Sequence, residues 1–549
     1  MYNLLIGGAA GQGIDTTAAV LEKLLKRAGY SVLTVRDFMS RIRGGHNFMQ
    51  IRFGTERVLS HARELDGMIA LDDDTVDLHI GDLKEDGFVL CDQKLATADP
   101  RAIKIDMDGM AKSLGNPRVS GSIAVGVVWK LFSQKIENAL DVFGEFVKEQ
   151  YLDVNKKAIE AGFGLVESRY PHLEGAYRDW MLVSGSKAVA LGAVAAGLRF
   201  YAAYPMSPST VVMETLAGMS GAAHIVVEQA EDEIAGINMA IGASYAGARA
   251  MTGTSGGGFS LKVEALGLAG MAEIPLVVID VQRPGPATGL PTRTEQSDLK
   301  FVVSASQGEF PRMVIAVRHP QDAFYQTVRA FNLAEKYQIP VILLSDQYVG
   351  DATYTVEPFD ISGIRMEEPA QTHEGEYLRY AYTESGISPR LIPGKSSHLV
   401  LVDSDEHDES GHITESAEVR VAMADKRMKK LEGLKQELLE PEFIGPADFE
   451  TLLIGWGSTW GPISEAVKLM DRTAALVFGD VYPLPEKLIL EKSKQAKRII
   501  NVEQNATGQL AGLIREATGI VMDDSILKYD GRQVSGEEIA ARIGKGESK

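Results

Sequence analysis

Cysteine is almost absent from this chain, which has Cys91 alone among 549 residues. A single thiol excludes a disulfide within the chain and fits a reducing compartment, so we expect a cytoplasmic protein. It also argues against an iron–sulfur cluster held by this chain alone, because such clusters usually need about four thiolates.

Long apolar runs and an excess of basic charge are also absent. No segment approaches the roughly 18 apolar residues of a membrane-spanning helix. The N-terminus begins with a strand-like run and lacks the basic and apolar regions of a signal peptide. The formal net charge of −19 makes nucleic acid and anionic membranes poor partners.

Glycine, in contrast, is abundant at 55 residues, and it punctuates a repeated alternation of strand-like and helix-like segments. This alternation predicts an α/β protein with several parallel-sheet domains. The length suggests three or four domains of about 150 residues each. The boundaries that we expect are an α/β domain at 1–165, a linker at 166–182, a second α/β domain at 183–350, a connecting segment with a charged helix at 351–445, and a last α/β domain at 446–549.

A glycine-rich loop, Gly7–Gly13, opens the first domain between strand-like runs at Tyr2–Ile6 and Ser31–Val35. The strand–helix–strand order predicts a parallel βαβ unit. The loop lacks the third glycine of the dinucleotide fingerprint and the Gly-Lys-Ser/Thr of a P-loop. The backbone N–H groups at Gly11 and Gly13 could still hold a phosphate group, and tight packing of strand on helix is the alternative.

Arg41 and Arg43 lie in a basic, glycine-containing loop of an otherwise acidic chain. Two interpretations stay open for them, solvated surface charge and contact with a phosphate group or a partner.

Polar groups also follow two strands of the second domain. In the turn Tyr204–Thr210, two prolines fix the backbone, and its three hydroxyls exceed what capping of the next helix requires. Arg283 follows the apolar run Pro275–Val281, where it could grip a carboxylate bidentately or form a surface ion pair. Because ligands bind at the carboxyl ends of parallel strands, both places are candidate binding sites.

Four carboxylates fall within the six residues Glu228–Glu233, between a strand-like run and a helix pattern over Ile234–Gly247. Acidic residues are common in the first turn of a helix because they favour the positive end of its dipole. The alternative is that one carboxylate faces inward and acts on a cofactor.

Two further charged stretches have plain interpretations. Asp403–His412 combines carboxylates with His407 and His412, but the histidine spacing of five and the lack of cysteine argue against a metal site. Ala417–Glu440 is a helix of mixed charge, which we expect to be solvated or to face another subunit.

Together these motifs resemble those of the 2-oxoacid:ferredoxin oxidoreductases, which are thiamine diphosphate enzymes, and in particular their α subunit with a γ domain fused at its N-terminus. The resemblance covers nearly the whole chain and implies a pyrimidine-binding domain and a transketolase C-terminal-like domain. The stretches that carry it are Gly8–Gly13 with Arg43-Gly44-Gly45, Tyr204–Thr210, Glu231–Ala235, Thr288–Gln296, Glu406–Glu409 and Glu503–Gln509.

The resemblance implies that Glu233 is the carboxylate beside N1′ of the cofactor's aminopyrimidine. There it favours the imino tautomer that deprotonates the thiazolium C2. Helix geometry agrees, since Glu233 shares a helical face with Ile237 and Ile241 and so points toward the core. Tyr204 and Pro205 are implied as further cofactor contacts.

The resemblance also implies the substrate-binding groups. Arg283 corresponds to the arginine that holds the 2-oxoacid carboxylate, with Thr292 nearby. Ser207 stands where the family has a substrate-contacting threonine, and Ser255–Gly258 lacks the family's usual proline among its glycines.

The implied reaction is decarboxylation of a 2-oxoacid, transfer of electrons to ferredoxin and transfer of the acyl group to coenzyme A. A β subunit is implied to hold the cofactor's diphosphate, Mg²⁺ and a [4Fe–4S] cluster, in an (αβ)₂ assembly, with no metal on this chain. Gly11, Gly13, Arg41 and Arg43 are the candidate coenzyme A contacts.

The fused γ–α form and Tyr204–Thr210 resemble the 2-oxoglutarate branch, which implies 2-oxoglutarate as the substrate, while pyruvate and branched-chain 2-oxoacids stay open. Two other functions remain open as well. One is a stand-alone NAD(P)-dependent oxidoreductase that uses residues 1–40 with Asp37 on the ribose, and the other is a non-catalytic scaffold.

Overall fold

The computed structural model describes residues 1–39, 45–143, 147–370 and 372–544. It divides into two compact units, which are described separately. Unit 1 comprises Met1–Val183 and Ala352–Pro358, and unit 2 comprises Ser184–Asp351 and Phe359–Lys549. None of the helices within the described ranges is both long and apolar enough to cross a membrane.

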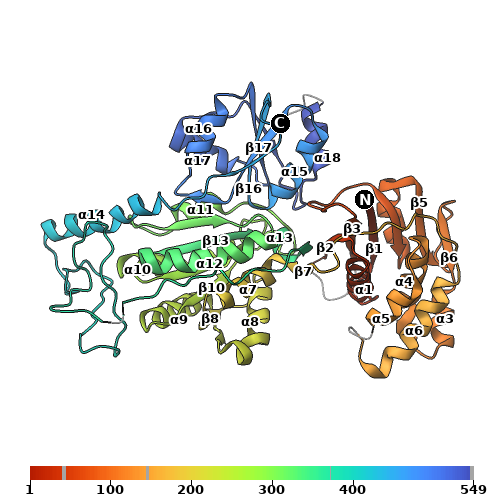
Figure 1. Cartoon of the computed structure of the whole chain (residues 1–549), viewed down its shortest axis with the longest axis horizontal. Helices are drawn as coiled ribbons and strands as arrows, with labels where there is room; N and C mark the ends of the chain where they lie inside the picture. Colours follow the sequence, from red (N-terminus) through yellow and green to blue (C-terminus); the bar gives the residue numbers. More distant parts are fainter. Residues whose placement is uncertain (40–44, 144–146, 371, 545–549) are drawn as a thin grey trace. The chain divides into compact units, whose positions relative to one another are not determined.

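Unit 1 is built on an eight-stranded mixed sheet (Figure 1). In spatial order its strands are β6 (Ala102–Ile105), β5 (Leu83–Asp92), β4 (Leu65–Ala70), β1 (Tyr2–Ala9), β3 (His46–Gly54), β2 (Ser31–Asp37), β14 (Thr353–Val356) and β7 (Met181–Ser184). Its helices are α1 (Ile14–Arg27), α2 (Asp73–His79), α3 (Met107–Ser113), α4 (Ser120–Leu131), α5 (Ile136–Phe143) and α6 (Glu149–Phe163). Strands β7 and β14 join this sheet from outside residues 1–165.

The predicted parallel βαβ unit at the N-terminus was wrong in one respect. Strands β1 and β2 run in the same direction, but β3 lies between them and pairs antiparallel with both. The parallel part of the sheet is β1, β4, β5 and β6. Sequence periodicity identifies strands but not their neighbours, so the insertion of β3 could not be foreseen.

The main core of unit 1 lies between this sheet and helices α1, α4 and α6. Helix α1 buries the apolar stripe that its sequence predicts, with Val20, Leu21, Leu24 and Leu25 all at 5% exposure or less. Full burial of each such side chain contributes roughly 1.5–3 kcal/mol.

The first sheet of unit 2 has seven strands. Their spatial order is β18 (Asp480–Tyr482), β12 (Met313–Ala316), β13 (Pro340–Asp346), β11 (Leu276–Gln282), β10 (Ala250–Thr254), β8 (Phe200–Ala203) and β9 (Val226–Gln229). All neighbours are parallel except β12 and β18. Parallel strands buried on both faces read as apolar runs, as β11 does over Leu276–Ile279.

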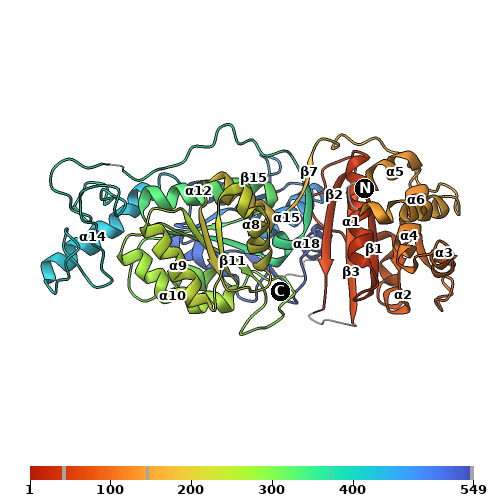
Figure 2. The same ribbon diagram turned by 90° about the horizontal axis from the view of Figure 1, so that it is seen from below.

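Helices cover both faces of this sheet, and α9 and α10 lie on the face opposite to α8 and α12 (Figure 2). The bounds are α7 (Gly185–Ala195), α8 (Thr210–Ala223), α9 (Glu233–Tyr245), α10 (Gly256–Met271), α11 (Leu299–Ser304), α12 (Pro320–Tyr337) and α13 (Gln347–Asp351).

The C-terminal part of unit 2 forms a five-stranded sheet in the order β15 (Glu442–Ile444), β17 (Thr473–Phe478), β16 (Thr451–Trp456), β19 (Arg498–Glu503) and β20 (Asp524–Leu527). Its helices are α15 (Trp460–Leu469), α16 (Lys487–Ser493), α17 (Gln509–Thr518) and α18 (Gly536–Gly544). One hydrophobic core runs without interruption from α9 and α10 into this sheet. The two sheets of unit 2 are therefore packed as one body.

Helix α14 (Ala417–Leu434) departs on one face from the expectation of a solvated or subunit-facing arm at Ala417–Glu440, while its other residues are exposed or half-buried. One face of α14 is buried against the rest of unit 2, and that face carries Met423, Lys426, Arg427 and Lys430. The expectation missed this face because mixed charge along a helix shows that polar partners are needed, and these can be protein groups as well as water.

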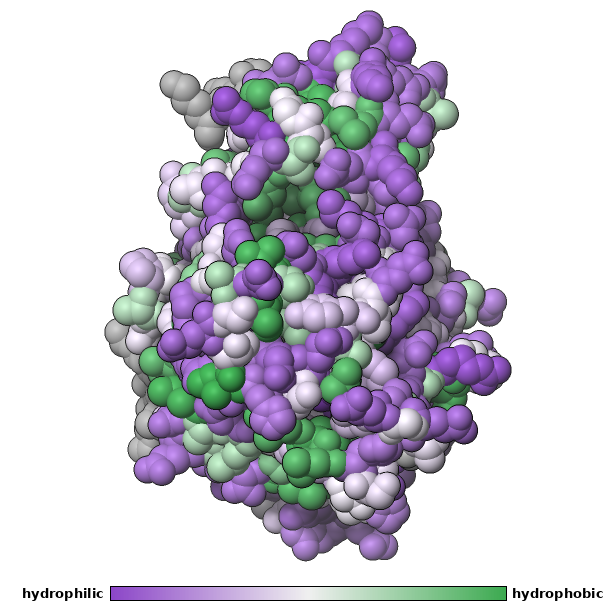
Figure 3. Space-filling view, turned by 90° about the vertical axis from the view of Figure 1, so that its left-hand side faces the viewer, coloured by the Kyte–Doolittle hydropathy of each residue, from purple (hydrophilic) through white to green (hydrophobic). Residues whose placement is uncertain are grey.

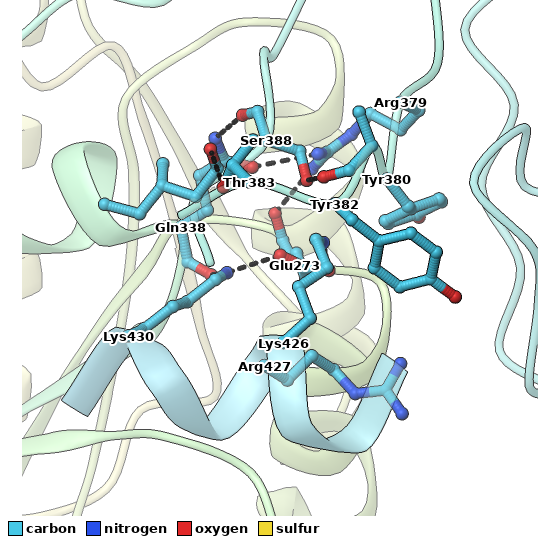
Figure 4. A network of polar contacts seen from close by, with 12 residues as sticks. Glu273, Gln338, Arg379, Tyr380, Tyr382, Thr383, Ser388, Lys426, Arg427 and Lys430 are labelled. Atoms are coloured by element: carbon cyan, nitrogen blue, oxygen red, sulfur yellow. Dashed lines mark hydrogen bonds and ion pairs between the residues drawn. The ribbon is translucent and has the colours of Figure 1, made fainter. Parts of the chain in front are cut away.

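The two lysines of this face, Lys426 and Lys430, both contact Glu273, which lies just past the end of α10 (Figure 4). Lys426 Nζ lies 2.6 Å from Glu273 Oε1, and Lys430 Nζ lies 2.5 Å from Oε2. Arg379 donates to the main-chain oxygen of Glu273 at 2.7 Å and to the side chain of Gln338, at the end of α12. Three cations thus satisfy the ends of two helices, where unpaired carbonyls gather.

Candidate active site

Four neighbouring strands place the candidate groups at one edge of the seven-stranded sheet. Strands β9, β8, β10 and β11 are adjacent and parallel, so their carboxyl ends meet at the same edge. Glu233, Ser207, Ser255 and Arg283 follow these strands in turn. The site therefore lies where ligands bind in sheets of this kind.

Glu233 is the first residue of α9 and has a relative exposure of 4%. It lies on the buried face with Ile237 and Ile241, as the helical period predicts. Asp232 caps the helix by accepting from the Ala235 N–H at 2.7 Å, while Glu228 and Glu231 are exposed. Within the described residues the Glu233 carboxylate receives no hydrogen bond, so one buried carboxylate remains available to a ligand.

The glycine turn at the start of α10 provides the space for this carboxylate. A Cβ on Gly258 would lie 2.6 Å from Glu233 Oε1 and 2.3 Å from Thr254 Oγ1. A Cβ on Gly256 would lie 2.4 Å from Asp298 Oδ2. Two carboxyl groups thus rest directly on the first turn of α10, which only glycine permits at these positions.

Arg283 and Ser207 are brought together across the sheet edge. Arg283 Nη1 donates to the main-chain oxygen of Ser207 at 2.8 Å. No other hydrogen bond of the guanidinium occurs in the described part of the chain, so its Nη2 and Nε can serve an anion. The Ser207 side chain is exposed beside it, and Tyr204 is 40% exposed while Pro205 is half-buried.

Thr292 is half-buried on the loop that begins at Arg283. The base of this loop is closed by two contacts, from the Asp298 N–H to Gln282 Oε1 at 2.9 Å and from Ser297 Oγ to the Arg283 oxygen at 3.3 Å.

The far part of this loop is fixed to the C-terminal sheet. Gln296 and Gln504 exchange hydrogen bonds, since the Gln296 N–H donates to the Gln504 oxygen at 2.7 Å and the Gln504 N–H donates to Gln296 Oε1 at 3.0 Å. The side chain of Asn505 donates to the Gln296 oxygen at 3.1 Å. Two of the recognised motifs, Thr288–Gln296 and Glu503–Gln509, therefore bind each other and hold the Arg283 loop in place.

Comparison with known proteins agrees with this geometry. A family model described as "Pyruvate flavodoxin/ferredoxin oxidoreductase, thiamine diP-bdg" matches residues 191–426, and one described as "Pyruvate ferredoxin/flavodoxin oxidoreductase" matches residues 3–165. A Sulfolobus sp relative named 2-oxoacid:ferredoxin oxidoreductase subunit alpha is 33% identical over 97% of this chain and 95% of its own length. The chain belongs to the 2-oxoacid:ferredoxin oxidoreductase family.

Two further matches lie within the 2-oxoglutarate branch of this family. A structure described as 2-oxoglutarate:ferredoxin oxidoreductase from Magnetococcus marinus, with 2-oxoglutarate, coenzyme A and succinyl-CoA bound, has a TM-score of 0.94 at 30% identity and covers 100% of this chain and 99% of that chain. The 2-oxoglutarate oxidoreductase subunit KorA of Mycobacterium tuberculosis is 32% identical over 80% of this chain and 70% of its own. The predicted family, the α/β class with a thiamine diphosphate-binding domain and the role as an enzyme subunit are confirmed.

Three polar residues beside the site of this oxidoreductase subunit were not identified from the sequence. Lys262 on α10 is fully buried next to Glu233, Asp280 is fully buried at the end of β11, and the Asp298 carboxyl lies over Gly256. The available signal was a charged residue inside an otherwise apolar run, as Asp280 is within Leu276–Gln282.

The other predicted groups lie in unit 1. Gly11 and Gly13 have φ values of 94° and 88°, and their exposed turn has open space where a side chain would stand. Gln12 fills part of the turn, since its Oε1 accepts from the Ala9 N–H at 2.7 Å. Arg41 and Arg43 lie outside the described residues.

The structure argues against the alternative that residues 1–40 bind a dinucleotide. Nucleotide binding of that kind needs adjacent parallel strands around the glycine turn, but β3 separates β1 from β2 and pairs antiparallel with both. Asp37 at the end of β2 is 8% exposed, which leaves little of its side chain to meet a ribose.

The acidic stretch Glu406–Glu409 has a structural role here. Glu406 accepts from Arg420 at 2.6 Å and from Arg427 at 2.8 Å. The buried His407 ring packs against Tyr380, with ring centroids 3.9 Å apart and ring planes tilted by 41°. No group of three or more metal-binding side chains occurs among the residues for which the structure gives positions.

Proposed function

We propose that this α subunit supplies Glu233 and Arg283 to the thiamine diphosphate-dependent oxidative decarboxylation of a 2-oxoacid, with coenzyme A and ferredoxin as the other reactants. The observation that carries the proposal is the Glu233 carboxylate, which is buried at the edge of the sheet without a hydrogen bond from the described chain. The cofactor fits this place, because it would bring a nitrogen donor to an orphaned carboxylate above a glycine turn.

Glu233 would hold the proton at N1′ of the aminopyrimidine. Thiamine diphosphate, when bound, supplies the carbanion that attacks the 2-oxoacid and accepts its electrons after decarboxylation. The low exposure of Glu233 strengthens the contact, since a charge-assisted hydrogen bond is worth more away from water. Tyr204 and Pro205, at the end of the neighbouring strand β8, are the further cofactor contacts that we propose.

Arg283 would hold the 2-oxoacid carboxylate through the N–H groups that it does not give to Ser207. The Ser207 hydroxyl would contact the substrate beside it, and Thr292 would contribute from the same loop as Arg283. The Asp298 contact at the base of that loop and the Gln296 contact at its far part would hold Arg283 in place.

A β subunit would complete the site by holding the diphosphate, Mg²⁺ and the [4Fe–4S] cluster, since Cys91 is the single cysteine of this chain. The surface beside Glu233 suits such a partner, because Ile234 and Met239 on α9 and Leu261 on α10 are 42–51% exposed. Figure 3 shows hydrophobic patches among hydrophilic side chains on the side of unit 2 that carries α14, α10 and α9. We propose a cytoplasmic (αβ)₂ assembly.

For the substrate we propose 2-oxoglutarate, with pyruvate and branched-chain 2-oxoacids as alternatives. The support is the naming of two similar proteins, the Magnetococcus marinus enzyme and the KorA subunit. The glycine turn at Gly11 and Gly13 is the coenzyme A contact that we propose in unit 1, together with Arg41 and Arg43. The residue domains 1–165, 183–350 and 446–549 would be the γ-like, pyrimidine-binding and transketolase C-terminal-like domains, joined by 166–182 and 351–445.

The test is Glu233→Gln in the assembled αβ complex, assayed with several 2-oxoacids, coenzyme A and a viologen acceptor. We expect turnover to fall by at least about a hundredfold, which is the usual scale for loss of an acid–base group. Glu231→Gln is the matched control, because Glu231 is exposed two residues earlier, and its turnover should be unchanged. Unchanged turnover in Glu233→Gln would favour the scaffold alternative, and nicotinamide binding by the purified chain would revive the NAD(P) alternative.

A further inference from the structure

Lys262 stands out among the groups around Glu233 because it is a cation with an exposure of 0%. It projects from α10, and its Nζ donates to the main-chain oxygen of Glu233 and to Thr252 Oγ1, both at 3.0 Å. An ammonium group has three donors, and both acceptors here are neutral. Within the described residues no carboxylate lies within ion-pair distance of this ammonium.

Such a cation is costly to bury, because it exchanges its hydration for only two neutral hydrogen bonds. Burial lowers the pKa of Lys262 to about 8, and the charges of Glu233 and Asp232 limit the fall. The ammonium form therefore still predominates at neutral pH. An apolar side chain of similar length would fill the same space at less cost, so packing alone does not account for the lysine.

The contacts of Lys262 link it to Glu233. Its hydrogen bond to the Glu233 oxygen fixes the first turn of α9 against β10, and the same turn aims the Glu233 carboxylate at Gly258. On the elements packed around Nζ, α9 contributes Asp232 and Glu233, β10 contributes the non-titrating Thr252, and Glu264 of α10 itself is exposed to solvent. A buried positive charge beside a buried carboxylate favours its ionised form.

We propose that Lys262 is a positioning residue for Glu233, whose ammonium keeps the Glu233 carboxylate ionised and correctly aimed until the cofactor binds. This inference rests on the proposed role of Glu233 at N1′. If Lys262 has this role, it sets how many protons the protein takes up when the cofactor binds. An ionised Glu233 must take up one proton to form the contact with N1′, whereas a Glu233 that is already protonated brings that proton with it.

The test measures proton uptake when thiamine diphosphate and Mg²⁺ bind to the αβ complex, by titration calorimetry at pH 7.5 in buffers of different ionisation enthalpy. We expect the uptake linked to Glu233 to be about one proton in the unaltered enzyme. In Lys262→Met it should fall by more than half, because loss of a neighbouring cation favours the protonated form of a buried carboxylate.

Three further variants separate charge from packing. Lys262→Gln keeps hydrogen-bond donors but removes the charge, so it should lose uptake as Lys262→Met does, and it serves if the methionine variant does not assemble. Lys262→Arg keeps the charge and should keep the uptake. Thr252→Val removes one acceptor of Nζ without changing any charge, and its uptake should equal that of the unaltered enzyme.

Measurements in the Glu233→Gln variant separate the role of Glu233 from the role of Lys262. There the uptake linked to Glu233 should vanish, and adding Lys262→Met should cause no further change. Full uptake in Glu233→Gln would overturn the role of Glu233 itself. Full uptake in Lys262→Met and Lys262→Gln, with the Glu233→Gln result as expected, would overturn the role of Lys262 alone.

Discussion

At the scale of single residues, Asp280 and Asp298 form an unusual pair beside Arg283. Both oxygens of Asp280 and Oδ2 of Asp298 are buried and have no hydrogen-bond donor in the described part of the chain. Burial raises the pKa of Asp280 well above its ordinary value, helped by the charge of Asp298, and burial raises the pKa of Asp298 to about 6. Two such carboxyls do not both ionise at neutral pH, so the pair holds one proton.

This pair predicts a pH dependence of substrate binding. Ionised Asp298 offsets the charge of Arg283, and the offset disappears as pH falls through about 6. The KM for the 2-oxoacid should therefore fall in acid by about three- to tenfold, since one charge several ångströms away contributes on the order of 1 kcal/mol.

The variant Asp298→Asn checks this from pH 5 to pH 8. It keeps the shape of the neutral carboxyl, so its KM should be low and nearly independent of pH. Glu295 also titrates nearby, since burial raises its pKa to about 7, and a pH dependence that survives in Asp298→Asn would assign the effect to Glu295 instead.

Arg283→Ala is predicted to raise the KM for the 2-oxoacid by about 10- to 100-fold. The reason is the loss of a charge-assisted hydrogen bond worth about 1.5–3 kcal/mol. Arg283→Lys should lie between the two enzymes, because it keeps the charge but not the two-pronged geometry. An unchanged KM in Arg283→Ala would mean that the substrate carboxylate is held by other groups.

At the scale of elements, sequence reasoning succeeded where the signal was local. The period of 3.6 residues put Glu233 on the buried face of α9, and the apolar stripe of α1 fell where its sequence placed it. It failed where a partner far along the chain decides the outcome. The insertion of β3 between β1 and β2 is such a case.

Helix α14 shows the same limit for charge. Its sequence reads as a solvated helix, yet Lys426 and Lys430 are buried because Glu273 and two helix ends lie opposite them. Glu273 itself adopts φ 52°, a left-handed position that usually selects glycine after a helix. The requirement for its carboxylate explains why a strained residue stands there.

Glu273→Gln is therefore predicted to destabilise unit 2 by about 3–5 kcal/mol, since it leaves buried cations without their counter-charge. The measurement is chemical denaturation at pH 7, with Glu264→Gln on the exposed face of α10 as the control. Lys430, Lys426 and Arg379 outweigh burial and hold the pKa of Glu273 far below its usual range, so its contribution is lost only in strong acid. Equal denaturation midpoints for the two variants would contradict the assigned role.

At the scale of the whole molecule, the resemblance to the family predicted more of the candidate site than physical reasoning from the residues alone. Turn chemistry and strand ends singled out Tyr204–Thr210 and Arg283 as candidates, but the roles of Glu233 and Ser207 came from the resemblance. What neither could supply is the reciprocal binding of Gln296 and Gln504, because the two motifs lie about two hundred residues apart and meet only in the folded unit. Long-range pairing of this kind leaves no periodic signal in either stretch.

The proposed sharing of the cofactor site with a β subunit leads to a prediction about assembly. A partner that completes the cofactor site must approach Glu233, and Ile234 is the next residue, 50% exposed on α9. Ile234→Lys places a charge where we expect apolar contact, so co-purification with the β subunit should be lost while the thermal midpoint of the isolated chain changes little. Leu469→Lys is the matched control, since Leu469 is an exposed apolar residue on a different helix, α15, at 61% exposure. If both variants bind the β subunit equally well, the partner reaches Glu233 without covering the first turn of α9.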